Sequence, residues 1–267
     1  MKKKFLILLL CALTVILPGC GGESEPIFEP YTDFNGSDPT AHVQIDSGVT
    51  IDGVLDDQIW KKNKTGITIA GATTDQTTKK PIDIKTYGER SATVYTYIGE
   101  KAVYFAFKVT DKNLYYNAEQ AQGSSTCVEL YFTGKSQITF NRGCYSVRVN
   151  PTGKEGAEAV NIGIYIPNAA GNGWSSTSMR GKVDAAVKVD GRVKNVYADK
   201  DYSTEDNKGY VMEIAIDKSL FGDNADAIKF TAAFVQDKGF DQPRLNNSFI
   251  PDTHYLRPTT WVTMRNK

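Results

Sequence analysis

Two oppositely charged residues, Glu129 and Arg148, lie in segments whose alternating polarity is typical of β-strands. Within 128–133 the aliphatic residues and Phe share one face and Glu129 takes the other, and within 145–150 Arg148 faces away from its valine neighbours. If the segments pair through the connection at 133–144, Glu129 and Arg148 become cross-strand neighbours. Such a couple can form charge-assisted hydrogen bonds with a polar ligand, or it can be a solvated ion pair contributing about 0.2–1 kcal/mol. Both interpretations stay open at this point.

The elements expected to position this couple are short β-strands rich in β-branched and aromatic residues. Gly, Asn, Asp and Pro separate them, and a hairpin is expected where Gly99-Glu100 joins two alternating runs. Helical signals are limited to 56–62 and one turn capped by Asp217. We therefore expect an all-β fold, an antiparallel β-sandwich of immunoglobulin or jelly-roll type with short helical turns. Strands are expected over 91–98, 101–109, 128–133, 145–150, 160–166, 185–189, 210–216, 230–236 and 261–264.

The composition excludes several function classes. The chain has 267 residues, with 31 Lys and Arg balancing 31 Asp and Glu and no basic run, which disfavours nucleic-acid binding. It has 2 histidines, His42 and His254, which argues against His-rich metal sites and against haem. The sequence contains no Gly-x-Ser-x-Gly, phosphate loop or Cys–His motif, so no enzyme is expected.

Metal binding has weak support in the sequence. Asp52, Asp56, Asp57 and Asp111 are oxygen donors near turns, but none forms an EF-hand-like loop. Solvated turn carboxylates are one interpretation and a structural calcium ion that stabilises a loop is the other. No metal-ligating residue is assigned from these aspartates.

The N-terminus has the pattern of an export signal. Three lysines precede an apolar run that is too short to span a bilayer comfortably, and Leu17-Pro18-Gly19-Cys20 resembles a bacterial lipobox. We expect a signal peptide at 1–19, a lipidated Cys20 with a flexible spacer to 41, and one domain at 42–267. The protein is then exported and lipid-anchored to the bacterial membrane, at the cell surface or periplasmic face. The alternative is an ordinary secretory signal with a chance cysteine.

Two cysteines of the expected domain, Cys127 and Cys144, could form a disulfide in an exported protein. The strand register argues against a simple bridge. Pairing Glu129 with Arg148 puts the cysteines out of register, so both pairings cannot hold without a bulge. The disulfide stays open as a possibility.

Several motifs together resemble family 9 carbohydrate-binding modules. Residues 51–60, 103–111, 127–132 and 145–150 resemble successive signatures of that family, and later pieces at 173–174, 191–195 and 209–216 follow in the same order. The resemblance covers about residues 45–265 and implies a β-sandwich that binds sugars as an accessory to polysaccharide-degrading enzymes. Structural calcium also occurs in the family.

The resemblance implies which residues hold the sugar. Glu129 and Arg148 match a pair that contacts hydroxyls, and a sugar ring also needs aromatic side chains to stack on. The family's two sandwiching tryptophans are not carried over, so the nearest substitutes are tyrosines. Trp60 and Trp261 are expected to be structural, and Trp174 is left open between binding and burial. The carbohydrate-binding candidates are Glu129, Arg148, Asn150, Tyr116 (or Tyr115), Trp174 and Tyr255 (or His254).

The function expected from the resemblance is non-catalytic carbohydrate binding at the cell surface, accessory to glycan degradation. The expected partners are a glycan, the membrane through the lipid anchor, and surface glycoside hydrolases as candidates. One alternative is a β-sandwich interaction domain that has lost sugar binding. The other is a glycoside hydrolase, for which the sequence offers no positive residue evidence.

Overall fold

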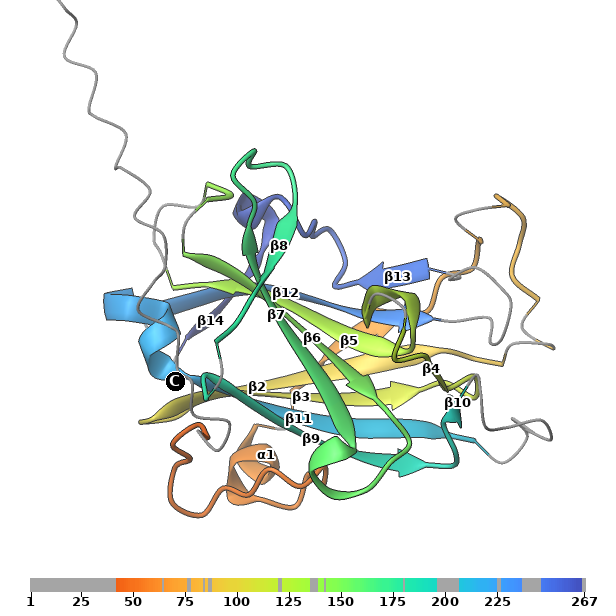
Figure 1. Ribbon diagram of the computed structural model, residues 1–267, viewed down its shortest axis with the longest axis horizontal. Helices are drawn as coiled ribbons and strands as arrows, with labels where there is room; N and C mark the ends of the chain where they lie inside the picture. The colour runs from red at the N-terminus through yellow and green to blue at the C-terminus, as the bar shows by residue number, and fades with distance from the viewer. Residues whose placement is uncertain are drawn as a thin grey trace, which may run out of the picture. The chain divides into compact units, whose positions relative to one another are not determined.

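In the computed structural model, the main regular secondary structure of the described residues is antiparallel β-sheet (Figure 1). The described residues are 42–265 except 64, 76–77, 84, 86–87, 120–121, 135–138, 142, 180, 196–206, 225–226 and 237–245. The signal peptide expected at 1–19, the lipidated Cys20 and the spacer to 41 lie outside the described residues. Among the described residues, no helix has the length and apolar character needed to cross a membrane.

The first sheet has the strand order β1-β2-β3-β11-β9, and each of its strand pairs is antiparallel. Its members are β1 (Ile67–Ala70), β2 (Ser91–Ile98), β3 (Ala102–Thr110), β9 (Val183–Asp190) and β11 (Gly209–Asp217). The β2–β3 hairpin closes where the Gly99 N–H donates to the Ala102 carbonyl at 2.9 Å, which confirms the turn expected there.

The second sheet has the order β13-β12-β5-β6-β7-β8, and β14 pairs with β12 beside β13. Its members are β5 (Cys127–Thr133), β6 (Cys144–Pro151), β7 (Val160–Pro167), β8 (Trp174–Thr177), β12 (Ala227–Gln236), β13 (Asn246–Phe249) and β14 (Val262–Arg265). A short parallel pair, β4 (Tyr115–Tyr116) with β10 (Lys194–Asn195), lies outside both sheets.

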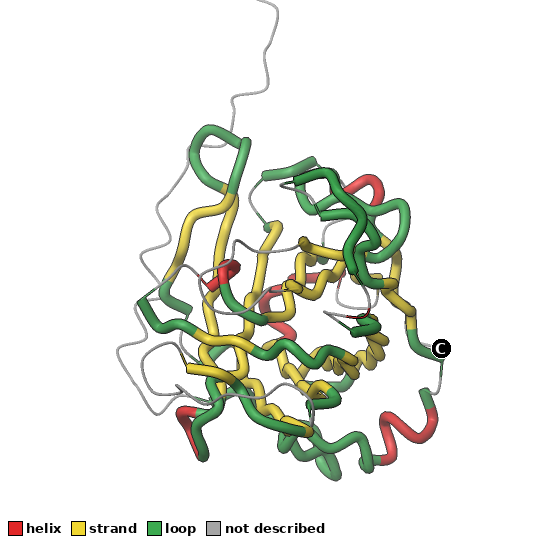
Figure 2. The backbone as a smooth tube through the Cα atoms, turned by 90° about the vertical axis from the view of Figure 1, so that its right-hand side faces the viewer, coloured by secondary structure: helices red, strands yellow, loops and turns green. Residues whose placement is uncertain are grey.

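Helical segments are short, and strands outnumber them clearly among the regular elements (Figure 2). Helix α1 spans Gln58–Lys62, and 3-10 segments occupy Gln122–Ser124, Gly156–Glu158, Lys218–Asn224 and Pro258–Thr260. The expected cap at Asp217 is present, because its Oδ1 accepts the Ser219 N–H at 2.8 Å.

The core lies between the two sheets, which confirms the predicted β-sandwich. Val103, Phe105, Phe107 and Val109 of β3 all point into it, as the alternation predicts. Phe105 meets Phe230 of β12 across the core with ring centroids 5.3 Å apart. The short strands β1, β4, β8, β10 and β13 were not predicted, because two to four residues are too few to show a period.

The outer face of the first sheet is covered by α1 and the segment that precedes it (Figure 1). Glu213 of β11 is buried on that face. Its Oε1 accepts the Trp60 indole N–H at 2.6 Å, and its Oε2 accepts the N–H groups of Gly53 at 2.8 Å and Asp52 at 3.1 Å. Residues 51–60 therefore act as a clamp on Glu213, and Trp60 is structural as expected.

We expect Gly53→Ala to lower the free energy of unfolding by about 2 to 4 kcal/mol. Gly53 has φ +80°, and a Cβ there would lie 2.5 Å from the Lys188 backbone nitrogen. Gly48→Ala is the matched control, because Gly48 has φ +76° but a Cβ there would have nothing within 4 Å. Chemical denaturation of both variants measures the difference, and equal losses would contradict the steric argument.

A buried ion pair joins Arg90 to Asp111 at the end of β3, with Nε and Oδ1 3.3 Å apart. Burial raises the pKa of Asp111 to about 6, although the Arg90 charge and the Asn113 N–H lower it. The folded state therefore holds the Asp111 proton more tightly than the unfolded state does, so this group's stabilisation is present near pH 4 and lost as pH rises through about 6.

Asp111→Asn removes this titration, so we expect its free energy of unfolding to fall less between pH 4 and 7 than that of the wild type. The decrease in the free energy of unfolding over this pH range should differ between the two proteins by at most about 3 kcal/mol. Urea denaturation at intervals across this pH range measures it. An equally steep fall in the variant would show that other groups are responsible.

Candidate functional site

Glu129 and Arg148 lie opposite each other on β5 and β6, which confirms the predicted pairing. The Arg148 Nε is 3.3 Å from Glu129 Oε1. Both residues point away from the core, because Val128 and Leu130 of β5 and Val147 and Val149 of β6 fill the inner face. The couple therefore lies at the centre of the outer face of the second sheet.

The carboxylate of Glu129 is enclosed rather than open to a ligand. Only 1% of the residue is exposed. Its Oε2 accepts the Tyr131 hydroxyl at 2.8 Å and the Asn247 side-chain amide at 2.7 Å. The resemblance implied direct contact of Glu129 with sugar hydroxyls, and the structure corrects this: the carboxylate is sequestered by its neighbours and holds Arg148 in place.

Arg148 is the member of the couple that reaches solvent, with 21% of its side chain exposed. Its guanidinium carbon lies 4.6 Å from the ring centroid of Tyr165 on β7. Gly163 of β7 stands directly opposite Arg148 and adds no side chain to this face. Burial lowers the pKa of Arg148, but the Glu129 charge together with Tyr131 and Tyr165 raises it further, so the net shift is upward and the guanidinium stays charged.

Aromatic rings surround the couple on one side. Tyr131 is central, with ring centroids 5.4 Å from Trp174, 5.8 Å from Tyr255 and 6.1 Å from Phe249. Burial and the nearby Glu129 charge raise the pKa of Tyr131 well above its usual value, so its hydroxyl remains a donor. Trp174 and Tyr255 are half-buried and form the accessible part of this aromatic cluster.

Polar atoms around the cluster lack hydrogen-bond partners among the described residues. They are Ser146 Oγ, Trp174 Nε1 and Asn247 Oδ1. A buried polar atom without a partner loses about 1–3 kcal/mol of stabilisation, so such atoms are normally satisfied by water or by a ligand. Their position beside Arg148 is compatible with a site that binds hydroxyl groups.

Two predicted site residues are placed elsewhere. Tyr116 is buried in the core cluster and pairs through β4 with β10, away from the Glu129–Arg148 couple. Asn150 is 0% exposed, and its amide donates to the Thr126 carbonyl at 2.9 Å. Tyr116 and Asn150 were predicted to bind carbohydrate, and the structure buries both side chains, so neither is part of the exposed surface around Arg148.

The possible disulfide is not formed. Cys127 and Cys144 are buried thiols that begin β5 and β6, so the antiparallel pairing puts them at opposite ends of the strand pair. Cys144 lies opposite Thr133, as the register with Glu129 and Arg148 requires.

Trp261 packs beside Cys144 and donates its indole N–H to the His254 carbonyl at 2.9 Å, which confirms a structural role.

Three of the four aspartates considered for calcium are engaged by protein groups. Asp52 Oδ1 and Asp57 Oδ2 accept backbone N–H groups at 2.9 Å and 2.7 Å, and Asp111 faces the Arg90 guanidinium, which would repel a cation. In the part of the chain that the structure describes, no cluster of three or more His, Cys, Asp or Glu could hold a metal.

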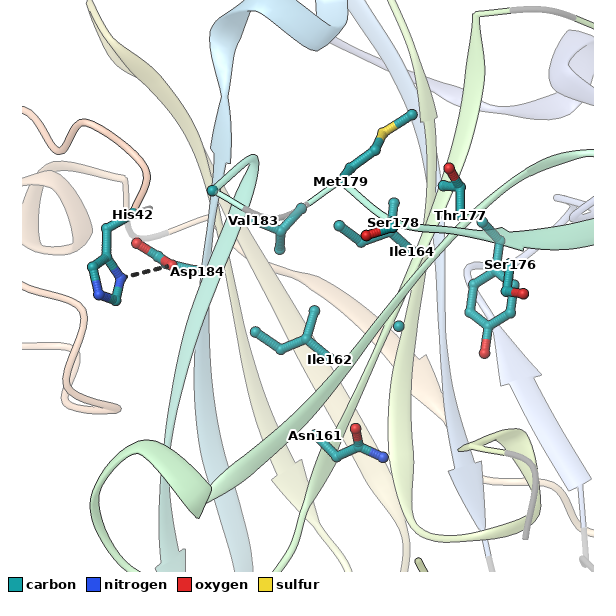
Figure 3. A pocket seen from close by; sticks show the side chains of 13 residues that line it. His42, Asn161, Ile162, Ile164, Ser176, Thr177, Ser178, Met179, Val183 and Asp184 are labelled. Carbon is teal, nitrogen blue, oxygen red and sulfur yellow. Dashed lines mark hydrogen bonds and ion pairs between the residues drawn. The ribbon is translucent and has the colours of Figure 1, made fainter. Parts of the chain in front are cut away.

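A hollow of about 770 Å³ lies beside the couple, between β7 and β9 (Figure 3). Gly163 and Tyr165, next to Arg148, belong to its wall. Figure 3 shows Ile162 in the middle, with His42 and Asp184 on one side and Ser176 and Thr177 on the other. No pattern in the sequence indicated this hollow.

The site also contains residues that were not predicted to belong to it. Tyr131 shares the face of Glu129 by simple alternation and could have been recognised from that period. Tyr165 lies on a predicted strand, but its proximity to Arg148 depends on the β6–β7 register. Asn247 and Phe249 lie on the short strand β13, which has no recognisable period.

The strand order and the core define an antiparallel β-sandwich, and its second sheet carries a partly exposed arginine beside aromatic rings. This chain resembles solved structures of family 9 carbohydrate-binding modules from Caldicellulosiruptor kristjanssonii. One, in complex with cellotriose, matches with a TM-score of 0.51 and 15% identity over 84% of this chain and 92% of that chain. Another, in complex with glucose, matches with a TM-score of 0.52 and 16% identity over 85% and 94%.

These comparisons show that the chain has a family 9 carbohydrate-binding-module-like fold. No family model matches the sequence. No curated protein matches it either.

Proposed function

We propose that this protein binds carbohydrate without cleaving it, on the outer face of the second sheet. The observation that carries the proposal is Arg148, which is anchored by buried Glu129, lies over Tyr165 and is partly exposed beside half-buried Trp174 and Tyr255. A fixed guanidinium donates to sugar hydroxyls, and aromatic rings accept the apolar face of a sugar ring. The similar structures, which hold glucose and cellotriose, support this proposal.

We infer weak binding, with Kd in the range of about 1 µM to 1 mM, because few polar contacts are exposed. The test is calorimetric titration with glucose and cellotriose, preceded by a glycan array. Reducing-sugar release from the bound glycans is measured in parallel. Binding without release supports the proposal, whereas release identifies a glycoside hydrolase.

A second candidate is a β-sandwich interaction domain without sugar binding. It is favoured by the enclosure of Glu129 and by the way the aromatic rings pack against Tyr131 rather than standing apart. A glycan array with no bound sugar, from a protein that melts cooperatively, would select this candidate over the first.

We also propose where in the cell the protein is located. The expected lipidation of Cys20 would tether the domain to the exported face of a bacterial membrane, where it retains glycans near surface glycoside hydrolases.

We expect palmitate label to be incorporated by the wild-type chain and lost in Cys20→Ser, because only a thiol can carry the thioether-linked lipid. Labelling of cells that express each form, followed by gel fluorography, measures this. Ser24→Ala is the control for a nearby change. Label retained by Cys20→Ser would leave an ordinary secretory signal as the explanation of the N-terminus.

A further inference from the structure

The hollow between β7 and β9 shares two wall residues with the surface around Arg148. Tyr165 lies under the Arg148 guanidinium and also lines the hollow, and Gly163 lies opposite Arg148 and lines it too. Because Gly163 has no side chain, little of β7 projects between Arg148 and the hollow at this position. A ligand bound at Arg148 is therefore separated from the hollow by one strand, β7.

The lining of the hollow combines an apolar floor with hydroxyl and amide groups. Ile162, Ile164, Val183 and Met179 form the apolar part, where the seam between the sheets opens at the edge of β7. The polar part consists of Asn161, Ser176, Thr177 and Ser178 with Asp184. A sugar unit presents apolar C–H patches with hydroxyls at their margin, which match this lining. The volume of the hollow, about 770 Å³, falls in the size range of small-molecule sites.

The charge of the hollow points to a neutral ligand. Among its described lining residues, the carboxylate of Asp184 is the acidic group and no lysine or arginine is present. Asp184 Oδ2 accepts the Val43 N–H at 2.9 Å, and Oδ1 lies 3.3 Å from His42 Nδ1. On the other side of β7, the Arg148 charge is already opposed by Glu129. An anionic sugar chain would therefore meet the negative charge of Asp184 in the hollow.

We infer that the hollow is an extension subsite, which rests on the proposed function: it receives the next unit of a neutral oligosaccharide whose first unit binds at Arg148. The chain of the ligand crosses β7 at Gly163, and its further unit lies on Ile162 with hydroxyls toward Ser178 and Asn161. The protein then distinguishes oligosaccharides from monosaccharides through the hollow rather than through the aromatic cluster.

The test uses Ser178→Trp, which fills the hollow, and Ser175→Trp as the matched control. Both serines are exposed and lie three residues apart, but only Ser178 lines the hollow. Calorimetric titration is carried out with glucose, cellotriose, mannotriose, xylotriose and trigalacturonate. For the best-bound neutral trisaccharide we expect Ser178→Trp to weaken binding about tenfold and Ser175→Trp to leave it unchanged. Glucose should bind both variants like the wild type.

The outcomes separate this inference from the proposed function. Equal trisaccharide affinity in the two variants, with binding that still depends on Arg148, overturns the subsite and leaves sugar binding intact. Trigalacturonate binding as tight as that of the neutral trisaccharides overturns the assignment to neutral chains. Failure of all five sugars to bind the wild-type chain overturns both proposals.

Discussion

Arg148→Ala is expected to weaken sugar binding about 10- to 100-fold, because a hydrogen bond from a charged donor contributes about 1.5–3 kcal/mol. The guanidinium is the exposed member of the couple and is fixed between Glu129 Oε1, 3.3 Å from its Nε, and the Tyr165 ring, 4.6 Å from its Cζ. Its donors are therefore oriented before the ligand arrives, and their loss is not compensated by another side chain. Titration with the best-bound sugar measures the effect.

The same variant leaves Glu129 buried without its cation, so we also expect a loss of stability of about 2 kcal/mol. Arg148→Lys keeps the charge and separates the two effects: it should stay close to the wild type in thermal melting but bind sugar more weakly, because an ammonium group lacks the planar fork of donors. Lys108→Ala, which removes an exposed side chain of β3, controls for loss of a positive charge. Unchanged affinity in folded Arg148→Ala would refute the site.

Glu213→Ala is expected to lower the free energy of unfolding by about 3 to 5 kcal/mol, because it removes the acceptor of several buried donors and leaves a cavity. The Trp60 indole N–H and the N–H groups of Gly53 and Asp52 all donate to this carboxylate. Burial raises the pKa of Glu213, and these hydrogen bonds lower it in part. For a chain of this size, the loss corresponds to a fall in Tm of about 10 °C.

Glu213→Gln tests the same clamp without creating a cavity. The glutamine keeps one acceptor oxygen but turns an amide donor toward an N–H group. We therefore expect its free energy of unfolding to lie between those of the wild type and Glu213→Ala. Glu100→Ala removes an exposed carboxylate from the turn between β2 and β3 and serves as the control. Because Glu213 lies on the first sheet, sugar binding by the folded variants should not change. A Tm within about 2 °C of the wild type for Glu213→Ala would contradict the clamp.

The strands of the sandwich could be predicted because their signal is local. Residues 91–98 alternate strictly, and β2 spans Ser91–Ile98. A period of two also fixes which face each side chain takes, so Glu129 and Arg148 could be placed together before any coordinates. The same register argued against a simple bridge between Cys127 and Cys144. Short strands such as β13 carry no period and were missed for that reason.

The exposure of the site residues could not be predicted in this way. Glu129 is enclosed by Asn247, which lies 118 residues away in the chain, and Tyr116 is covered by packing in the core. The clamp on Glu213 likewise joins it to Trp60 across 153 residues. No local pattern encodes such contacts.

The β-sandwich, the inward face of each long strand and the pairing of Glu129 with Arg148 follow from the order of the residues, because these features depend on an alternation between neighbouring residues. The folded chain was needed to see that Arg148 rather than Glu129 reaches solvent, that Tyr131 is the centre of the aromatic cluster, and that a hollow opens between β7 and β9. These features arise where segments distant in the chain pack together, and packing depends on the shapes of all the side chains that meet there.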